Sequence, residues 1–328
     1  MTVRAKRIRV CYTFSVPAQK VFCEETLLTK LRISIVQYLN TAPLVWGFTH
    51  GPLAGKYDLS FTVPSQCAEA LGEDEADLAI IPAIEYQRIP GLVLLPDMAI
   101  ASKKRVRSLL LVAKKPIREV ASIALDSSSR STQALTKILC ADRWHVAPKF
   151  SEAAPDLDAM LQDADAALLI GDPALRLAIL LEGHTRPDHE GAQMCSAEAA
   201  GVDGAERLFI YDIVEEWQRH TALPAVLAVW AARPGVVTEE VLRDFAASRD
   251  FGLAHIPEIS EVAAFELKLP APAMAAYLRE NIDYSLDTAN RRGLETFFSR
   301  AAALGLIDEH REILWAGAAA LRQTVSKS

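Results

Sequence analysis

The sequence lacks both an excess of basic residues and a long apolar run. Lys and Arg number 35 against 42 Asp and Glu, which gives a net charge of −7 at pH 7. A protein that tracks nucleic-acid phosphates needs a basic surface, so we expect no nucleic-acid partner. No apolar run reaches the ~20 residues of a membrane-spanning helix, so we expect no membrane partner either.

Paired cysteines are also missing. The five cysteines are scattered and odd in number, and none stands in a CxxC or Cys/His ligand spacing. Reduced thiols in a cytoplasmic protein explain this pattern best, because disulfides persist mainly in exported proteins. His184 and His189 lie five residues apart in a polar stretch, where an exposed loop is a simpler interpretation than a metal site. We therefore expect no metal.

The sequence contains no catalytic motif of fixed spacing. The GxSxG, HExxH, GxGxxG and Walker patterns are absent, and no Cys/His pair stands in a catalytic context. Nucleophilic and metal-dependent mechanisms thus have no support. Any chemistry would come from positioning, hydrogen bonding and exclusion of water.

An export signal is not recognisable in the first 30 residues. They begin with a basic stretch, but Glu24 and Glu25 interrupt the apolar residues and no small-residue cleavage site follows. We interpret residues 1–30 as an extension of unknown role and expect a cytoplasmic protein.

What the sequence does contain is a regular alternation of strand-like and helical segments. Its 328 residues exceed the usual size of one domain, which favours two lobes. The strand-like segments are mostly continuous apolar runs, as is typical of strands buried on both faces. Strands are predicted at 32–36, 57–63, 77–82, 92–95, 108–113, 122–125, 147–150, 166–170 and 225–230.

Helices are predicted between these strands and throughout the C-terminal part. The earlier ones span 65–71, 131–141, 155–162 and 174–182, and the later ones 238–254, 271–281, 285–304 and 308–323. The polar, Gly-rich stretch 184–206 is expected to be an irregular surface excursion.

This order predicts a two-lobed α/β protein with mixed, mostly parallel sheets and a helical C-terminal tail. Lobe I would combine residues 31–107 with 227–328, and lobe II would span 108–226. The strands near 107–113 and 225–230 would be the hinges about which the lobes close.

Polar residues follow the first predicted strand directly. Tyr38, Asn40 and Thr41 stand between it and a short helix. Carboxyl ends of parallel strands face the crevice in which α/β sheets bind ligands, so these residues are candidates for substrate binding. An alternative is equally good at this stage: Asn40 or Thr41 caps the helix, and Tyr38 belongs to the core.

A dense run of hydroxyl groups follows the sixth predicted strand. Ser128, Ser129, Ser131 and Thr132 stand where the next helix begins. Hydroxyls and backbone N–H groups at a helix N-terminus can hold a carboxylate without a cation, and Arg130 would add a bidentate contact. One serine would suffice as a helix cap, so the density of the run favours anion binding.

Two further strand-to-helix turns are expected at the same edge. One contains Pro82, and the other contains Gly171 and Asp172. Gly171 allows a ligand to approach the backbone closely, whereas Asp172, which precedes a proline, is more simply a helix cap. Glu85 is either a general base or a first-turn acid that complements the helix dipole.

Five blocks stand in order along the chain: SIVQYLNTAPLVWGF, ADLAIIPAIEY, IALDSSSRSTQALTKILC, ALLIGDPAL and EEWQRHTALPAVLAVWAA. Together they resemble the chorismate dehydratase family of the futalosine route to menaquinone. The resemblance covers about residues 31–306. Several blocks in order are far more specific than any single motif.

The resemblance implies a fold like the type II periplasmic binding proteins and a cofactor-free reaction, in which chorismate loses water to give 3-[(1-carboxyvinyl)oxy]benzoate. The family's key asparagine falls on Asn40, and its serine at the start of a hinge strand falls on Ser108; in the family both hold the substrate. The base would be the substrate's own enolpyruvyl carboxylate, or a side chain such as Glu85. Thr221, in the HTALP turn, is a weaker candidate for substrate binding.

Two rival functions share this fold. One is a small-carboxylate solute-binding protein without catalysis, which the missing export signal and the family blocks disfavour. The other is the related 1,4-dihydroxy-6-naphthoate synthase, whose N-terminal turn is usually of a Pro-Asn-Asp-Thr type. Asn40 within YLNTAPL favours the dehydratase.

Overall fold

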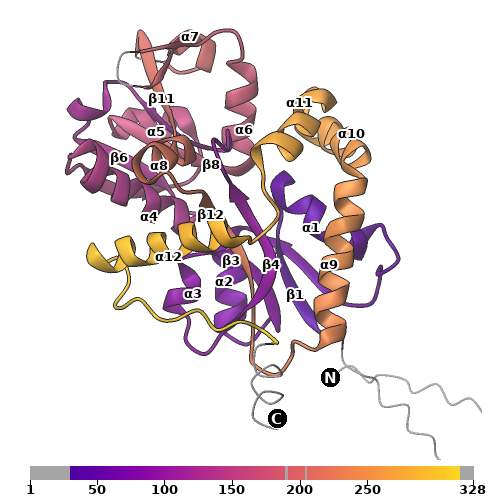
Figure 1. Cartoon of the computed structure of the whole chain (residues 1–328). Coiled ribbons are helices and arrows are strands. Elements are labelled where there is room, and N and C mark those ends of the chain that lie inside the picture. Colours follow the sequence, from indigo (N-terminus) through magenta and orange to yellow (C-terminus); the bar gives the residue numbers. More distant parts are fainter. Residues whose placement is uncertain (1–29, 189–190, 204, 318–328) are drawn as a thin grey trace, which may run out of the picture.

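The computed structural model describes residues 30–188, 191–203 and 205–317. They form two α/β halves, each built around one sheet (Figure 1). Residues 1–29 of the expected extension, and His189, lie outside the described residues.

The first sheet has the strand order β2-β1-β3-β12-β4. Strand β1 pairs in parallel with β2 and β3, whereas β12 is antiparallel to both β3 and β4. Strands β3 and β12 are buried along their whole length, which explains their uninterrupted apolar sequences. The bounds are β1 Arg32–Val36, β2 Asp58–Thr62, β3 Leu78–Pro82, β4 Val93–Ser102 and β12 Ala225–Ala232.

The second sheet has the order β7-β6-β8-β5-β11-β10-β9. Strand β6 pairs in parallel with β7 and β8, and the other neighbours are antiparallel. The bounds are β5 Leu109–Ala113, β6 Ser122–Asp126, β7 Lys149–Ala153, β8 Ala166–Ile170, β9 Arg186–Pro187, β10 Gln193–Ser196 and β11 Arg207–Asp212.

The mixed α/β class expected from the sequence is confirmed, but the share of parallel pairs is smaller than expected. Among the described strands, four neighbouring pairs are parallel and six are antiparallel. The parallel pairs lie between strands joined through helices, while β12 and β5 run opposite to the parallel strands of their sheets. The apolar runs correctly indicated strands that are buried on both faces. They did not indicate strand direction, because a buried strand can be parallel or antiparallel to its neighbours.

The chain crosses between the two sheets twice. Residues 103–108 join β4 to β5, and α8 (Ile213–Thr221) leads from β11 back to β12. Strand β5 belongs wholly to the second sheet and β12 to the first. Among the described residues, the crossings are therefore the segments next to these strands. That the halves close about this region stays a prediction. The lobe boundaries at residues 107 and 226 stay a prediction.

Helices surround both sheets (Figure 1). Helix α1 packs on α9, and α12 contacts both β12 and α4, which belongs to the other half. No helix among the described residues is long and apolar enough to cross a bilayer. The bounds are α1 Ala42–Thr49, α2 Pro64–Gly72, α3 Glu85–Arg88, α4 Arg130–Leu139, α5 Leu157–Asp163, α6 Gly171–Leu180, α7 Ala197–Ala200, α9 Glu239–Ala254, α10 Ile256–Leu267, α11 Ala271–Ala276 and α12 Thr288–Ala303, with short turns η1 Leu39–Thr41, η2 Ile117–Glu119, η3 Cys140–Trp144 and η4 Tyr277–Asn281.

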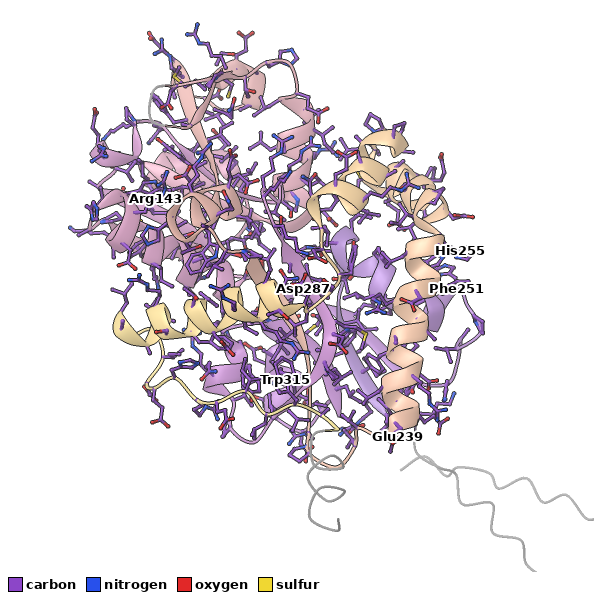
Figure 2. All side chains as sticks on the ribbon, in the orientation of Figure 1. Arg143, Glu239, Phe251, His255, Asp287 and Trp315 are labelled. Atoms are coloured by element: carbon purple, nitrogen blue, oxygen red, sulfur yellow. The ribbon has the colours of Figure 1, made fainter. Side chains whose placement is uncertain are left out.

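The predicted helix over 308–323 is wrong for the part that the structure describes, residues 308–317. There the backbone of Leu94, in edge strand β4, accepts a hydrogen bond from Ala316 N–H and donates one to the Leu314 carbonyl, both at 2.8 Å. The Trp315 ring packs on the Arg291 guanidinium at 4.4 Å (Figure 2). The open strand edge satisfies backbone groups that a helix would have paired internally.

The stretch expected to be irregular contains part of the second sheet. Strand β10 lies within it, and β11 follows directly and pairs with β5. The sequence of β11, RLFIYD, has charged residues at both ends of a short apolar centre. It therefore lacks the continuous apolar run on which the strand predictions depend. Helix α10 was likewise not anticipated.

Candidate active site

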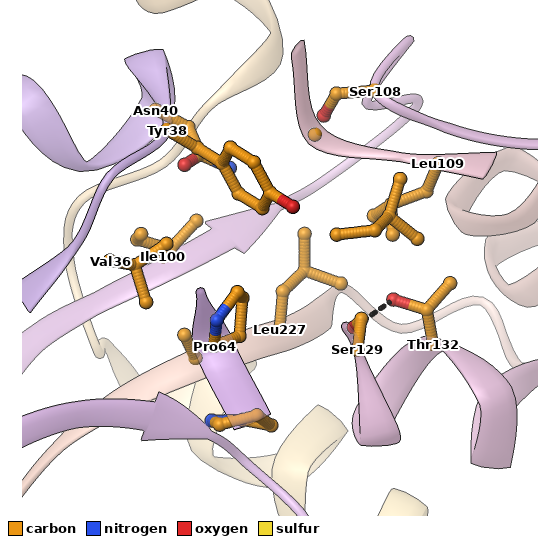
Figure 3. Close-up of a pocket in the computed structure, with 14 residues that line it drawn as sticks. Val36, Tyr38, Asn40, Pro64, Ile100, Ser108, Leu109, Ser129, Thr132 and Leu227 are labelled. Atoms are coloured by element: carbon orange, nitrogen blue, oxygen red, sulfur yellow. Dashed lines mark hydrogen bonds between the residues drawn. The ribbon is translucent and has the colours of Figure 1, made fainter. Parts of the chain in front are cut away.

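A cavity lies between the two halves, where strands β1, β3, β6 and β8 end (Figure 3). Its volume is about 50 Å³, below the ~300–1,000 Å³ of most small-molecule sites, so this arrangement of the halves leaves little room for a substrate. The first half contributes Val36, Tyr38, Asn40, Pro64, Pro82, Ile100, Leu227 and Ala228, and the second half contributes Ser108, Leu109, Ser129, Thr132, Ile170 and Gly171.

The turn after β1 places Tyr38 and Asn40 on the cavity. Figure 3 shows the Tyr38 hydroxyl pointing into the space between Ser108, Leu109 and Leu227. Thr41 is buried instead, and its hydroxyl donates to the Asn40 side-chain oxygen at 3.3 Å. Neither Asn40 nor Thr41 caps a helix with its side chain. The capping alternative is therefore wrong. The Thr41 hydroxyl instead orients the Asn40 side chain through this hydrogen bond.

Ser108 reaches the cavity from the segment that joins the two sheets. Arg107, immediately before it, has φ +65, and the Asp212 carboxylate accepts hydrogen bonds from Arg107 N–H at 2.6 Å and Val106 N–H at 3.0 Å. Burial raises the pKa of Asp212 to about 6. This anchored turn determines the position of Ser108, directly before β5.

Tyr277 also contacts the site, and sequence reasoning missed it. Its hydroxyl donates to Ser108 Oγ at 2.9 Å, and its side chain is 1% exposed. Burial raises the pKa of this phenol, while its hydrogen bond to Ser108 lowers it. No local motif marks Tyr277, which lies 169 residues from Ser108.

The hydroxyl run divides between the cavity and the protein interior. Ser129 and Thr132 line the cavity, and their hydroxyls lie 2.9 Å apart (Figure 3). Ser131 accepts the Ile84 N–H at 3.1 Å, across the two halves. Ser128 donates to the Asp126 carboxylate at 2.6 Å. The structure thus brings two of the four predicted hydroxyls to the cavity.

Asp126 is a fully buried carboxylate at the end of β6. It accepts hydrogen bonds from the backbone and hydroxyl of Ser128 and from Ile170 N–H at 3.3 Å. Burial raises its pKa. The Tyr38 hydroxyl lies 3.3 Å from Ser128 Oγ, and burial raises the pKa of Tyr38 too. These contacts link the first half to the turn before α4.

Gly171 and Asp172 begin α6 on the opposite side of the cavity. Gly171 has φ +66, and its N–H donates to the Ser108 carbonyl at 2.8 Å. Asp172 does not cap its own helix: its carboxylate accepts the Leu39 N–H of the first half at 3.1 Å. Burial raises the pKa of Asp172 to about 6. The predicted cap is thus a contact between the halves.

Glu85, Arg130 and Thr221 are engaged away from the cavity. Glu85 is buried and forms ion pairs with Arg88 at 2.8 Å and Arg130 at 3.1 Å, so two guanidinium groups engage its carboxylate. Arg130 also pairs with Glu69 at 2.6 Å, which occupies the guanidinium expected to hold substrate. Thr221 donates to the Trp217 carbonyl at the end of α8.

The residues that line the cavity among those described carry no formal charge. An anion would therefore be held by the N-terminus of α4, whose first-turn N–H groups lack intrahelical acceptors, and by the Ser129 and Thr132 hydroxyls. Within the described residues, no three His, Cys, Asp or Glu side chains cluster as metal ligands. The arrangement supplies hydrogen-bond donors in an otherwise apolar, closed space.

Comparison with known proteins shows to which family the chain belongs. A family model described as menaquinone biosynthesis matches residues 31–303. The chorismate dehydratase of Thermus thermophilus is 29% identical over 281 residues, which cover 84% of this chain and 95% of that protein.

Solved structures show the same fold at low identity. A protein from Archaeoglobus fulgidus superposes with a TM-score of 0.64 at 18% identity, over 86% of this chain and 100% of that one. The periplasmic aliphatic sulphonate binding protein SsuA from Escherichia coli has a TM-score of 0.55 at 16% identity, over 87% and 90% of the two chains. The fold is thus like that of the periplasmic binding proteins, as expected.

Proposed function

Because the chain belongs to the menaquinone biosynthesis family, we propose that it is a chorismate dehydratase of the futalosine route, cofactor-free and cytoplasmic. The observation that carries the proposal is the cavity between the halves, which joins Asn40 and Ser108 to the α4 N-terminus without any charged lining residue among those described. The Thermus relative supports the same activity.

The proposed reaction is an elimination without redox change. The C3 proton of chorismate leaves, its electron pair becomes a ring double bond, the C4–O bond breaks, and proton and hydroxide depart as water. The product, 3-[(1-carboxyvinyl)oxy]benzoate, has an aromatic ring, so most of the driving force lies in the substrate. Orientation and charge stabilisation are what the protein adds.

The cavity suggests a role for each polar group. Ser129, Thr132 and the α4 N-terminus would bind one carboxylate by charge-assisted hydrogen bonds. Asn40 and Ser108, on the opposite wall, would orient the second carboxylate or the leaving hydroxyl. Since Glu85 is paired with arginines, the substrate's enolpyruvyl carboxylate is the better candidate for the base.

The test is to incubate the purified full chain with chorismate and to follow the product by chromatography and mass. We expect loss of one water, and a decrease in kcat/KM of about 100-fold or more in Asn40→Ala. Asn40→Asp is the shape-matched variant: it retains the size of the side chain but loses the amide donors, and it is expected to be at least as slow.

Other outcomes would separate the rival functions. Chorismate that raises the melting temperature without reacting would favour a binding protein. If chorismate neither reacts nor stabilises, the dehydratase assignment is wrong, and the substrate of 1,4-dihydroxy-6-naphthoate synthase is the next to try.

A further inference from the structure

Tyr277 is a buried tyrosine whose hydroxyl contacts Ser108, one of the two residues on which the proposed function depends. It begins η4, a π-turn that continues α11, and such turns in helices are frequent at functional sites. Tyr277 is 1% exposed, so its hydroxyl is shielded from bulk water. A phenol buried to this degree needs a protein partner.

The hydrogen bond from Tyr277 determines where the Ser108 proton points. A serine hydroxyl has a single hydrogen and two acceptor lone pairs. The Tyr277 O–H donates to Ser108 Oγ at 2.9 Å and so occupies one lone pair. No acceptor for the Ser108 hydrogen lies within the described part of the chain, and Ser108 lines the cavity. The Ser108 hydrogen is therefore available to a ligand there.

Asn40 is oriented by the same group of side chains. The Thr41 hydroxyl donates to Asn40 Oδ1 at 3.3 Å, which leaves the NH₂ group of Asn40 on the other side. Asn40 and Ser108 both line the cavity, so the amide of one half and the serine of the other face the same space.

We propose that Tyr277 is a positioning residue: it directs the Ser108 hydroxyl hydrogen into the cavity, where it donates to the oxygen that leaves the substrate. This inference rests on the proposed dehydration. Tyr277 itself does not line the cavity and acts only through Ser108.

The first experiment is steady-state kinetics of Tyr277→Phe with chorismate. Phenylalanine retains the ring that fills the interior and removes only the donor. We expect kcat to fall about tenfold or more, with KM within about threefold of the wild type, because the lost interaction acts on the transition state. An unchanged kcat would overturn the proposal.

Tyr284→Phe is the matched control. Tyr284 follows η4, is buried, and its hydroxyl has no hydrogen-bond partner among the described residues. Loss of that hydroxyl is expected to leave kcat and KM unchanged. A similar loss of activity in both variants would mean that the effect comes from general packing, and would refute the positioning role.

A double variant separates positioning from a structural role. Once Ser108→Ala has removed the hydroxyl, adding Tyr277→Phe should change kcat by less than about twofold. A further large decrease would show that Tyr277 acts by another route.

Failure of the dehydratase assignment has a different signature. If the wild type does not convert chorismate, the proposed function fails, and the inference is then judged by an atomic-resolution crystal structure of Tyr277→Phe. A Ser108 hydroxyl hydrogen that turns away from the cavity supports the positioning role, and one that still points into the cavity contradicts it.

Discussion

The ring of Tyr38 lies so close to Gly171 that a Cβ on residue 171 would come within 2.8 Å of two ring carbons. Tyr38 follows β1 of the first half, and Gly171 begins α6 of the second, so this contact is a point where the two halves meet. Gly171 also has φ +66, a conformation that L side chains rarely adopt. The glycine is required both by its backbone and by its neighbour.

Gly171→Ala is therefore expected to impair closure of the halves. We expect kcat/KM for chorismate to fall about 100-fold or more, because closure completes the site. Gly183→Ala is the control: Gly183 has a similar φ of +78 but nothing within 4 Å of the added Cβ. That variant should lose only the roughly 1–2 kcal/mol of left-handed backbone strain and retain its activity. Equal activity of the two variants would contradict the contact.

Thr132→Val tests the carboxylate site. The substitution retains the shape of the side chain and removes the hydroxyl that lines the cavity. A hydrogen bond to a charged group contributes about 1.5–3 kcal/mol, so KM should rise about tenfold or more. Ser131→Ala is the control, because its hydroxyl accepts the Ile84 N–H outside the cavity. Ser131→Ala should lower the melting temperature without raising KM. A rise in KM in Ser131→Ala but not in Thr132→Val would contradict the proposed carboxylate site.

Asp172 makes stability depend on pH between about 4 and 6. Burial raises its pKa to about 6 in the folded state, above the ~3.9 of an unfolded aspartate. The folded state thus binds more protons in this window, so the free energy of unfolding falls as pH rises through it. Asp172→Asn should flatten this decrease in melting temperature, while an unchanged profile would show that Asp172 does not contribute.

Asp165 is a control of opposite sign. Its carboxylate pairs with Lys115 at 2.8 Å, which holds its pKa below the usual range. Its contribution to stability is present at neutral pH and is lost as pH falls through the folded-state pKa. Asp165→Asn should therefore destabilise at pH 7 and make little difference at the most acid pH.

Glu216 should matter far more to stability than its neighbour Glu215. Glu216 is 1% exposed and accepts hydrogen bonds from Arg143 at 2.5 Å and Trp144 at 3.3 Å. Removing one member of a buried ion pair typically costs about 3–5 kcal/mol. We expect Glu216→Ala to lose an amount in that range in denaturant unfolding.

The adjacent variant Glu215→Ala provides the comparison. Glu215 pairs with Arg219 on the surface of α8, where such pairs contribute about 0–1 kcal/mol. Losses of similar size in the two variants would show that the buried network stabilises no more than a surface pair does.

Side-chain direction explains why the sequence identified the hydroxyl run but not its division. Ser129 and Thr132 are three residues apart and face the same side at the start of α4, toward the cavity. Ser131 faces elsewhere and bonds Ile84, and Ser128, before the helix, turns to Asp126. Composition alone indicates that a hydroxyl-rich helix start is present, and only the orientation of that helix selects the members that reach a ligand.

The sequence by itself determined the α/β class, most strands, and the turns after β1, β6 and β8 that line the cavity. These features depend on apolar periodicity and on short-range order, which one chain segment contains on its own. Tertiary structure alone decided that Tyr277 lies behind Ser108, that Asp172 bonds the opposite half, and that Glu85 is paired with Arg130. These pairings join residues separated by 45 to 169 positions. No local pattern encodes such contacts, because they arise only when the two sheets pack against each other.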